Sequence, residues 1–370
     1  MLAGALSCAA TTQAAKDPDK KWVKRLEKME AHYDKGDYKH YRRASKQASR
    51  FNKKVSKKLG TNSKFLPMGQ LRLTRYQWAL GYTADLEKNV DEAISLSRKI
   101  NGPLSSGLGK DLLLASSIYM DYGNYLLAQE TLEKARTMPG MNNLPALEDS
   151  ELELVSLEIK LQRGFYADVL SSIDQLESEI KERAVRKVPV EITNKKGEKV
   201  IKQVKLEKEE VEKRLGQYGR LQVLRSATVG LRGDFSTSDS LFMLADRWIA
   251  KNLNKKSPEY INYLKWYGEV LWEHRYDIGK DLERHFESAL KAAQRVSRST
   301  NIDYMDFYCK LIKAYSFLEY KKTADKHITE YATVVKKSFG KKTYTLPGQP
   351  AGNGLHPQPQ RDQVHLQRGG

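Results

Sequence analysis

The residue types that most often carry out chemistry are present in this chain, but their spacing assembles no catalytic or metal site. Seven histidines are scattered along 370 residues. His32 and His40 flank one expected turn, yet no acidic or cysteine set accompanies them to complete a metal site. Glu151 and Glu153 are typical surface carboxylates of a helix, and only a pocket could shift their pKa values for catalysis. Glycine-rich phosphate loops and the HExxH, CxxC and Gly-x-Ser-x-Gly patterns are absent from the sequence. We therefore expect no enzyme activity, no cofactor, no metal ion and no small-molecule substrate.

A cluster of cations near the N-terminus is the strongest evidence in the sequence for the binding of an anionic partner. Residues 16–64 carry 17 Lys and Arg against 6 Asp and Glu, whereas residues 140–185 carry 4 against 10. Residues 39–58, with tyrosines among the cations, could hold the phosphates of nucleic acid or of an anionic membrane. The candidate patch is Lys39, Arg42, Arg43, Lys46 and Arg50. A solvated helix face that keeps the chain soluble is the simpler interpretation.

A short sequence motif recurs between stretches in which the apolar residues have helical spacing. It consists of a glycine, a variable residue and an aromatic residue, and it occurs as Gly36-Asp37-Tyr38, Gly123-Asn124-Tyr125, Gly164-Phe165-Tyr166 and Gly233-Asp234-Phe235. We interpret these motifs, together with turns expected near residues 88, 277 and 319, as the hinges between the two helices of successive two-helix units. The sequence therefore predicts an all-α solenoid of about seven helix-turn-helix hairpins, spanning residues 16–340.

Three segments depart from this pattern. Residues 188–206 alternate apolar and polar residues around a turn, which predicts an inserted β-hairpin. Residues 1–15 are small and uncharged, as in a secretory signal, and Cys8 follows Ala-Leu-Ser as in a bacterial lipoprotein cleavage box, where it would carry the lipid. A disordered cytoplasmic N-terminus is the alternative. Residues 341–370 are rich in Pro, Gly and Gln, which predicts a disordered tail.

The third hairpin resembles a tetratricopeptide repeat, a helix-turn-helix unit of 34 residues. That family places an aromatic residue on the first helix, then a turn, and then small and large apolar residues on the second helix. The matching residues here are Tyr119, the turn Gly123-Asn124-Tyr125, Ala128, Leu132 and Ala135, with Pro139 near the closing proline. The small residues let the two helices approach, and the large ones fill the space toward the next hairpin.

The resemblance implies a right-handed superhelix whose first helices line a concave groove that binds a peptide or protein segment. The expected groove residues are Arg75, Trp78, Tyr82, Asp85, Lys110, Ser117, Met120, Glu151 and Glu158. For Trp78 and Tyr82, packing inside the hairpin core is an equally good interpretation. Some family members clamp a peptide carboxylate with Lys and Asn, but the corresponding positions here include Leu26, Glu30 and Leu113, which departs from that clamp.

We therefore expect a non-enzymatic scaffold for protein–protein interaction, exported to a bacterial periplasm or outer-membrane surface. A cytoplasmic location is the alternative that follows if residues 1–15 are not a signal. In an alternative function, the chain is a basic module that binds nucleic acid or an anionic membrane through residues 39–58. Another is the sensory repeat half of a histidine kinase-like protein, which would require the reading frame to be truncated after the last repeat.

Overall fold

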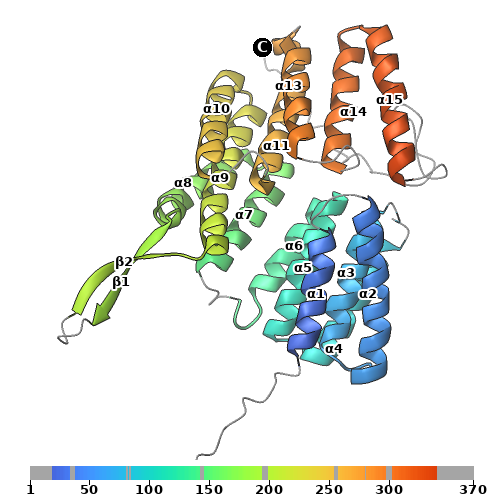
Figure 1. Ribbon diagram of the computed structural model, residues 1–370, viewed down its shortest axis with the longest axis vertical. Coiled ribbons are helices and arrows are strands. Elements are labelled where there is room, and N and C mark those ends of the chain that lie inside the picture. The colour runs from blue at the N-terminus through green and yellow to red at the C-terminus, as the bar shows by residue number, and fades with distance from the viewer. Residues whose placement is uncertain are drawn as a thin grey trace, which may run out of the picture.

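The chain folds into a stack of helical hairpins (Figure 1). The computed structural model describes residues 19–33, 38–80, 82, 85–141, 146–193, 199–253, 257–279, 281–296 and 302–339. The expected signal segment with Cys8, the hinge at Gly36 and the expected tail at 341–370 lie outside these residues, so those interpretations remain predictions.

Seven hairpins account for the described helices, which confirms the predicted all-α solenoid. They pair α1 (Lys20–Tyr33) with α2 (Tyr38–Leu59), α3 (Phe65–Trp78) with α4 (Leu86–Asn101), α5 (Ser106–Tyr122) with α6 (Tyr125–Arg136), α7 (Ala146–Gln162) with α8 (Tyr166–Arg183), α9 (Lys208–Leu231) with α10 (Phe235–Asn252), α11 (Pro258–Glu273) with α13 (Asp281–Val296), and α14 (Ile302–Phe317) with α15 (Lys321–Phe339). The short helix α12 (Arg275–Ile278) lies in the sixth turn.

The glycine hinges form for a conformational reason. Gly123, Gly164 and Gly233 have φ angles of 86°, 82° and 118°, a region that residues with a side chain rarely adopt. The next residue then caps the second helix in two of these hinges: Asn124 accepts a hydrogen bond from the backbone of Leu127, and Asp234 accepts one from Thr237. Each of these motifs therefore ends one helix and starts the next.

The predicted hinge near residue 88 is displaced in the structure. Helix α3 ends at Trp78 and α4 begins at Leu86, so the turn lies several residues earlier than expected. Asp85 precedes α4 with a φ of 62°, a conformation that Asp tolerates better than most residues. Gly81 and Asp85 both lie in the sequence of this turn, and the residue directly before α4 that takes the left-handed conformation is the aspartate.

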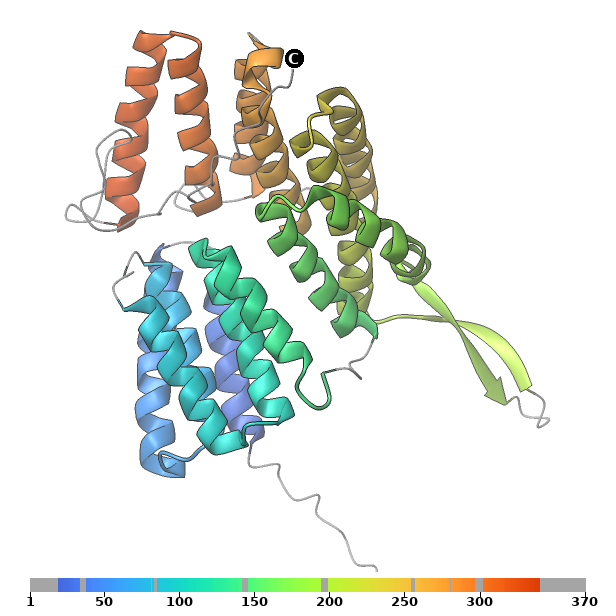
Figure 2. The same ribbon diagram turned by 180° about the vertical axis from the view of Figure 1, so that it is seen from behind.

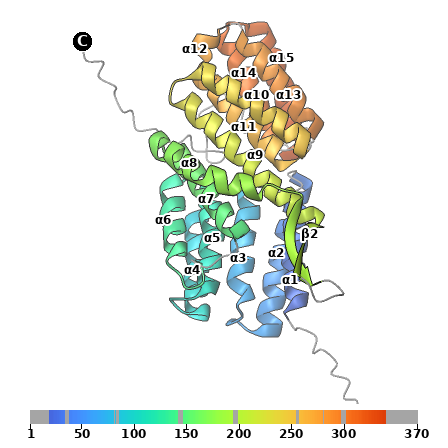
Figure 3. The ribbon, with the colours of Figure 1, turned by 90° about the vertical axis from the view of Figure 1, so that its left-hand side faces the viewer.

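Helix α7 joins the two halves of the apolar core. Its Leu152 and Ile159 pack with the core of the second and third hairpins, whereas Leu154 and Leu157 pack with the core of the hairpins that follow. Figure 3 shows α7 and α8 between the block of α1–α6 and the block of α9–α15. Burying one such leucine contributes about 2 kcal/mol, so α7 fastens both blocks into one stack.

The stack is curved with the first helices on its inner side. First helices of neighbouring hairpins contact one another from α1 to α5 and again from α7 to α14. Within the described part of the chain, no second helix makes comparable contact with the second helix of the next hairpin. The curvature brings α15 against α2, so the two ends of the stack approach each other (Figures 1 and 2).

One tyrosine–carboxylate hydrogen bond recurs at an equivalent place in three hairpins. The pairs are Tyr119 with Asp91 at 3.1 Å, Tyr267 with Asp239 at 2.9 Å and Tyr315 with Glu287 at 2.8 Å, each pair 28 residues apart. In each, the hydroxyl on a first helix donates to the second helix of the preceding hairpin. Burial, together with the nearby carboxylate, raises the pKa of all three tyrosines. These bonds help to fix the register between successive hairpins.

The predicted β-hairpin is confirmed and projects from the stack between α8 and α9 (Figure 1). Strands β1 (Lys187–Thr193) and β2 (Lys199–Lys205) pair antiparallel, with Lys187 opposite Lys205 and Val190 opposite Lys202. The whole of β2 is exposed. Both faces of this two-stranded arm therefore meet solvent.

Candidate functional site

Charged pairs connect the first helices along the inner face. The pairs are Glu30–Arg72 at 2.7 Å between α1 and α3, Arg75–Asp121 at 2.9 Å between α3 and α5, Glu158–Arg220 at 2.8 Å between α7 and α9, and Glu269–Lys310 at 2.7 Å between α11 and α14. Most of these side chains are less than one-third exposed. The inner face is therefore polar and largely neutralised by its own pairs.

The pair of Glu158 and Arg220 is the most enclosed of these. Arg220 donates from Nε and from Nη2 to the two carboxylate oxygens of Glu158, each at 2.8 Å, and it also contacts Glu151. The two paired side chains are 10% and 16% exposed. Burial alone would raise the pKa of Glu158, but the charge and hydrogen bonds of Arg220, with a bond from Asn262, lower it below its ordinary value. Glu158 is therefore an anion with its charge compensated inside the site.

A cavity of about 260 Å³ lies beside this pair, between α7, α9 and α11. Lys213, Gln217, Glu259 and Asn262 are among its lining residues. Gly216 also lines it, and a methyl group there would meet a carboxylate oxygen of Glu259 at 2.5 Å. The absence of a side chain at this position lets Glu259 lie against α9.

Asn262 has a buried acceptor that no described residue satisfies. Its Nδ2 donates to Glu158 Oε1 at 3.1 Å, which fixes the amide orientation because only the nitrogen can donate to a carboxylate. The opposite atom, Oδ1, is buried and has no hydrogen-bond partner among the described residues. Such an orphaned acceptor costs about 1–3 kcal/mol and calls for a donor.

A second hollow, of about 380 Å³, lies between α1 and α3. Val23, Leu26, Phe65 and Met68 give it an apolar lining, and the Glu30–Arg72 pair lies at its edge. Val23 is 41% exposed, so the hollow opens to solvent. The inner helices thus offer one polar and one apolar recess.

The expected groove residues of the second hairpin have different environments. Arg75 pairs with Asp121 and stacks over the ring of Tyr33 at 4.6 Å, which links α1, α3 and α5. Trp78 is half-buried against the core clusters. Tyr82 and Asp85 lie beyond the end of α3, and Tyr82 is 64% exposed. Their expected place on a first helix is therefore wrong, because that helix ends at Trp78.

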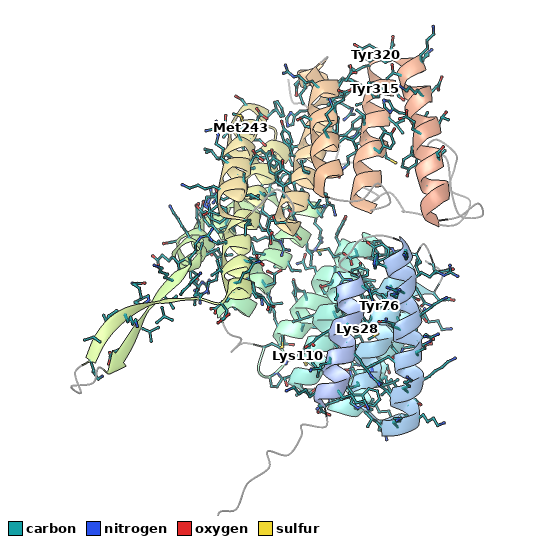
Figure 4. All side chains as sticks on the ribbon, in the orientation of Figure 1. Lys28, Tyr76, Lys110, Met243, Tyr315 and Tyr320 are labelled. Atoms are coloured by element: carbon teal, nitrogen blue, oxygen red, sulfur yellow. The ribbon has the colours of Figure 1, made fainter. Side chains whose placement is uncertain are left out.

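The expected residues of α5 share one stripe of that helix. Lys110 is exposed and is labelled in Figure 4, whereas Ser117 and Met120 are half-buried. Ser117 donates to the backbone carbonyl of Leu113 at 3.1 Å, and Met120 packs against the core. No contact in the described structure brings this stripe to the cavity beside Arg220.

Sequence reasoning found Glu151 and Glu158 but missed Arg220 and Asn262, which complete the cluster. Both partners come from helices far along the chain, 62 and 104 residues from Glu158. Arg220 interrupts a stretch of α9 that is otherwise buried from Leu215 to Leu221, but this burial is visible only in the structure. A cation within a buried stretch indicates a paired anion elsewhere.

The basic patch lies on α2, away from the inner face. Its five members, Lys39, Arg42, Arg43, Lys46 and Arg50, are all exposed. None of them forms an ion pair with another described residue. Within the described ranges, no cluster of His, Cys, Asp and Glu could hold a metal ion. The helices described also include none with the length and apolarity that crossing a membrane requires.

Comparison with known proteins supports the fold alone. No protein-family model matches the chain, and no curated protein is similar to it in sequence. A crystal structure of a Rap protein complexed with competence and sporulation factor is similar, with a TM-score of 0.52, 8% identity, and coverage of 86% of this chain and 78% of that chain. The apo form of RapI has a TM-score of 0.48 at 12% identity, covering 86% and 77%. The chain is a helical solenoid of the same general fold as the first of these proteins.

Proposed function

We propose that this chain is a non-enzymatic scaffold of the tetratricopeptide type, which binds an extended peptide or protein segment on its inner face. The binding site is the cavity between α7, α9 and α11. The observation that carries the proposal is that Asn262 lines this cavity and that its buried Oδ1 has no partner among the described residues.

The chemistry of the cavity suits a polypeptide backbone. An extended peptide has a row of N–H donors, and one of them would satisfy the acceptor of Asn262. Glu158 holds the amide of Asn262 in position, and Arg220 holds Glu158, so the acceptor is oriented before any ligand arrives. Preorganisation of this kind reduces the entropy lost on binding. Exposed Lys213, also at the cavity, adds a contact for an acidic side chain of the ligand.

Two further observations support the proposal. The small and apolar residues that resemble a tetratricopeptide repeat are buried at their expected places, with Ala128, Leu132 and Ala135 each at most 2% exposed. The similar Rap protein was crystallised in complex with competence and sporulation factor. By analogy of fold, we infer that the inner face of this chain also receives a ligand. Export of the chain and its membership in a histidine kinase-like protein remain hypotheses.

A peptide selection on the full chain tests the proposal. Peptides selected from a random display library would be measured by fluorescence anisotropy against wild type, Asn262→Ala and Asn252→Ala. Asn252 is the matched control, since among the described residues its side-chain amide bonds to the carbonyl of Trp248 on the same helix, α10. We expect Asn262→Ala to weaken binding about threefold to tenfold, as expected for one lost hydrogen bond, and Asn252→Ala to have no effect. Equal binding by all three proteins would contradict the proposed site.

A further inference from the structure

The outer side of the first hairpin is cationic over two neighbouring helices. Helix α2 carries nine Lys and Arg residues in 22 positions and no acidic residue. All nine are exposed, and none pairs with a described carboxylate. With 3.6 residues per turn, they occupy one stripe about 160° wide and about 28 Å long. The buried residues Ala44, Ala48, Phe51 and Val55 form the opposite stripe.

Helix α1 extends this surface beside α2. Its Lys21, Lys24 and Lys28 are exposed at helical spacing, and Figure 4 labels Lys28 on α1 next to α2. The acidic residues Glu27 and Glu30 line the hollow that faces α3 instead. This hairpin is the first of the stack, and the described helices that contact α2 are α1, α3 and, from the other end of the stack, α15. The end of the solenoid is therefore a broad cationic surface rather than a ridge.

We propose that this cationic end surface of α1 and α2 docks on the anionic headgroups of a lipid bilayer. Two antiparallel helices lie about 10 Å apart, so their cations present a flat array that matches a planar surface better than a nucleic-acid groove. Three aromatic residues of these helices are not available to stack on bases: Trp22, Tyr41 and Phe51 are buried, and Arg25 covers the ring of Trp22 at 4.9 Å. The described residues that make up this docking surface are lysines and arginines, so the association is peripheral and reversible. Each cation near an anionic surface strengthens binding about fivefold.

Vesicle binding by the full chain tests this inference. The probes are vesicles of phosphatidylcholine alone or with about one-third phosphatidylglycerol, and a duplex DNA at the same phosphate concentration. The test variant is Arg42→Glu/Arg43→Glu/Lys46→Glu. The matched control, Lys199→Glu/Lys202→Glu/Lys205→Glu, makes the same charge change on the β-hairpin, where these lysines are also exposed.

We expect wild type and the control to bind only the anionic vesicles, and to lose binding at about 0.5 M salt as screening shortens the range of the charges. The α2 variant should bind more than 100-fold more weakly, at an unchanged helical circular dichroism signal. Equal loss in the control would show that only net charge matters, and tighter binding to duplex DNA would show a nucleic-acid surface. Either result, or equal binding to uncharged vesicles, overturns the inference. None of these outcomes depends on the peptide site at Asn262.

Discussion

Replacing Asp111 with asparagine should stabilise the protein at neutral pH. Asp111 lies on α5 and is 2% exposed, and its one hydrogen bond from a described side chain comes from the hydroxyl of Ser97 at 2.7 Å. Burial raises the pKa of this carboxyl to about 6, from an ordinary value of 3.8, despite the opposing hydrogen bond of Ser97 and the charge of Arg72. At 1.36 kcal/mol per pKa unit, ionising Asp111 in the folded state costs about 3 kcal/mol.

The direction of the pH dependence follows from this raised pKa. Between about pH 4 and pH 6, the folded state keeps a proton at Asp111 that the unfolded chain has lost, so the contribution of Asp111 to stability falls as pH rises. Above pH 6 both states are ionised, and the full penalty remains. Asparagine has no charge to bury and can still accept the bond from Ser97. Its second amide proton has no assured partner, which reduces the expected gain at pH 7 to about 2 kcal/mol.

Urea unfolding of wild type and Asp111→Asn at pH 7 and at pH 4 measures this effect. The variant should be more stable at pH 7 and nearly equal to wild type at pH 4. Asp174→Asn serves as the control, because that carboxylate is 65% exposed in its ion pair with Arg225, and its loss should change stability by less than about 1 kcal/mol. A variant that is less stable than wild type at pH 7, or equally shifted at both pH values, would refute the reasoning about burial.

Three further substitutions test other parts of the structure. Glu158→Gln should lower the free energy of unfolding by about 3 kcal/mol in urea titrations, because Arg220 would lose its bidentate partner. Since the pKa of Glu158 is lowered, its contribution is present above about pH 4 and is lost on acidification, so wild type and variant should converge in acid. Tyr267→Phe removes the hydrogen bond to Asp239 and should lower the free energy of unfolding by about 1 kcal/mol, measured as a lower midpoint of thermal unfolding. An unchanged midpoint would show that this bond does not stabilise the stack. Gly233→Ala places a side chain at a φ of 118° and should cost about 1–2 kcal/mol by the same measurement, although nothing lies within 4 Å of the added carbon.

The local features of the fold were predictable from the sequence, and the contacts across the stack were not. The hinges at Gly123, Gly164 and Gly233 could be located because a left-handed residue there favours glycine, which is visible without any tertiary information. The turn before α4 was misplaced although Gly81 lies in it, and the residue that takes the left-handed conformation directly before the helix is Asp85. Local sequence shows where glycine is needed, but it does not show where another residue takes the same strain.

The candidate site depends on the contacts that local sequence does not determine. Glu158 was recognised as a residue of a first helix, but its partner Arg220 lies 62 residues away, beyond an inserted β-hairpin. The spacing between these residues depends on the insertion, so no fixed repeat length relates them. In contrast, the 28-residue separation of Tyr267 and Asp239 recurs because those two hairpins follow each other without an insertion.

Two buried carboxylates of first helices, Asp111 on α5 and Glu158 on α7, show what a buried charge requires in this fold. Asp111 has no ion-pair partner among the described residues, so burial raises its pKa and its charge is a cost. Glu158 is also buried, but the bidentate contact with Arg220 reverses the direction of the pKa shift. A charge on the inner face is thus tolerated where a neighbouring first helix supplies its partner. The cations of α2 have no such partner among the described residues, and being exposed they need none to remain charged. The inner face is therefore suited to recognition by oriented hydrogen bonds, whereas α2 is suited to attraction by unneutralised charge.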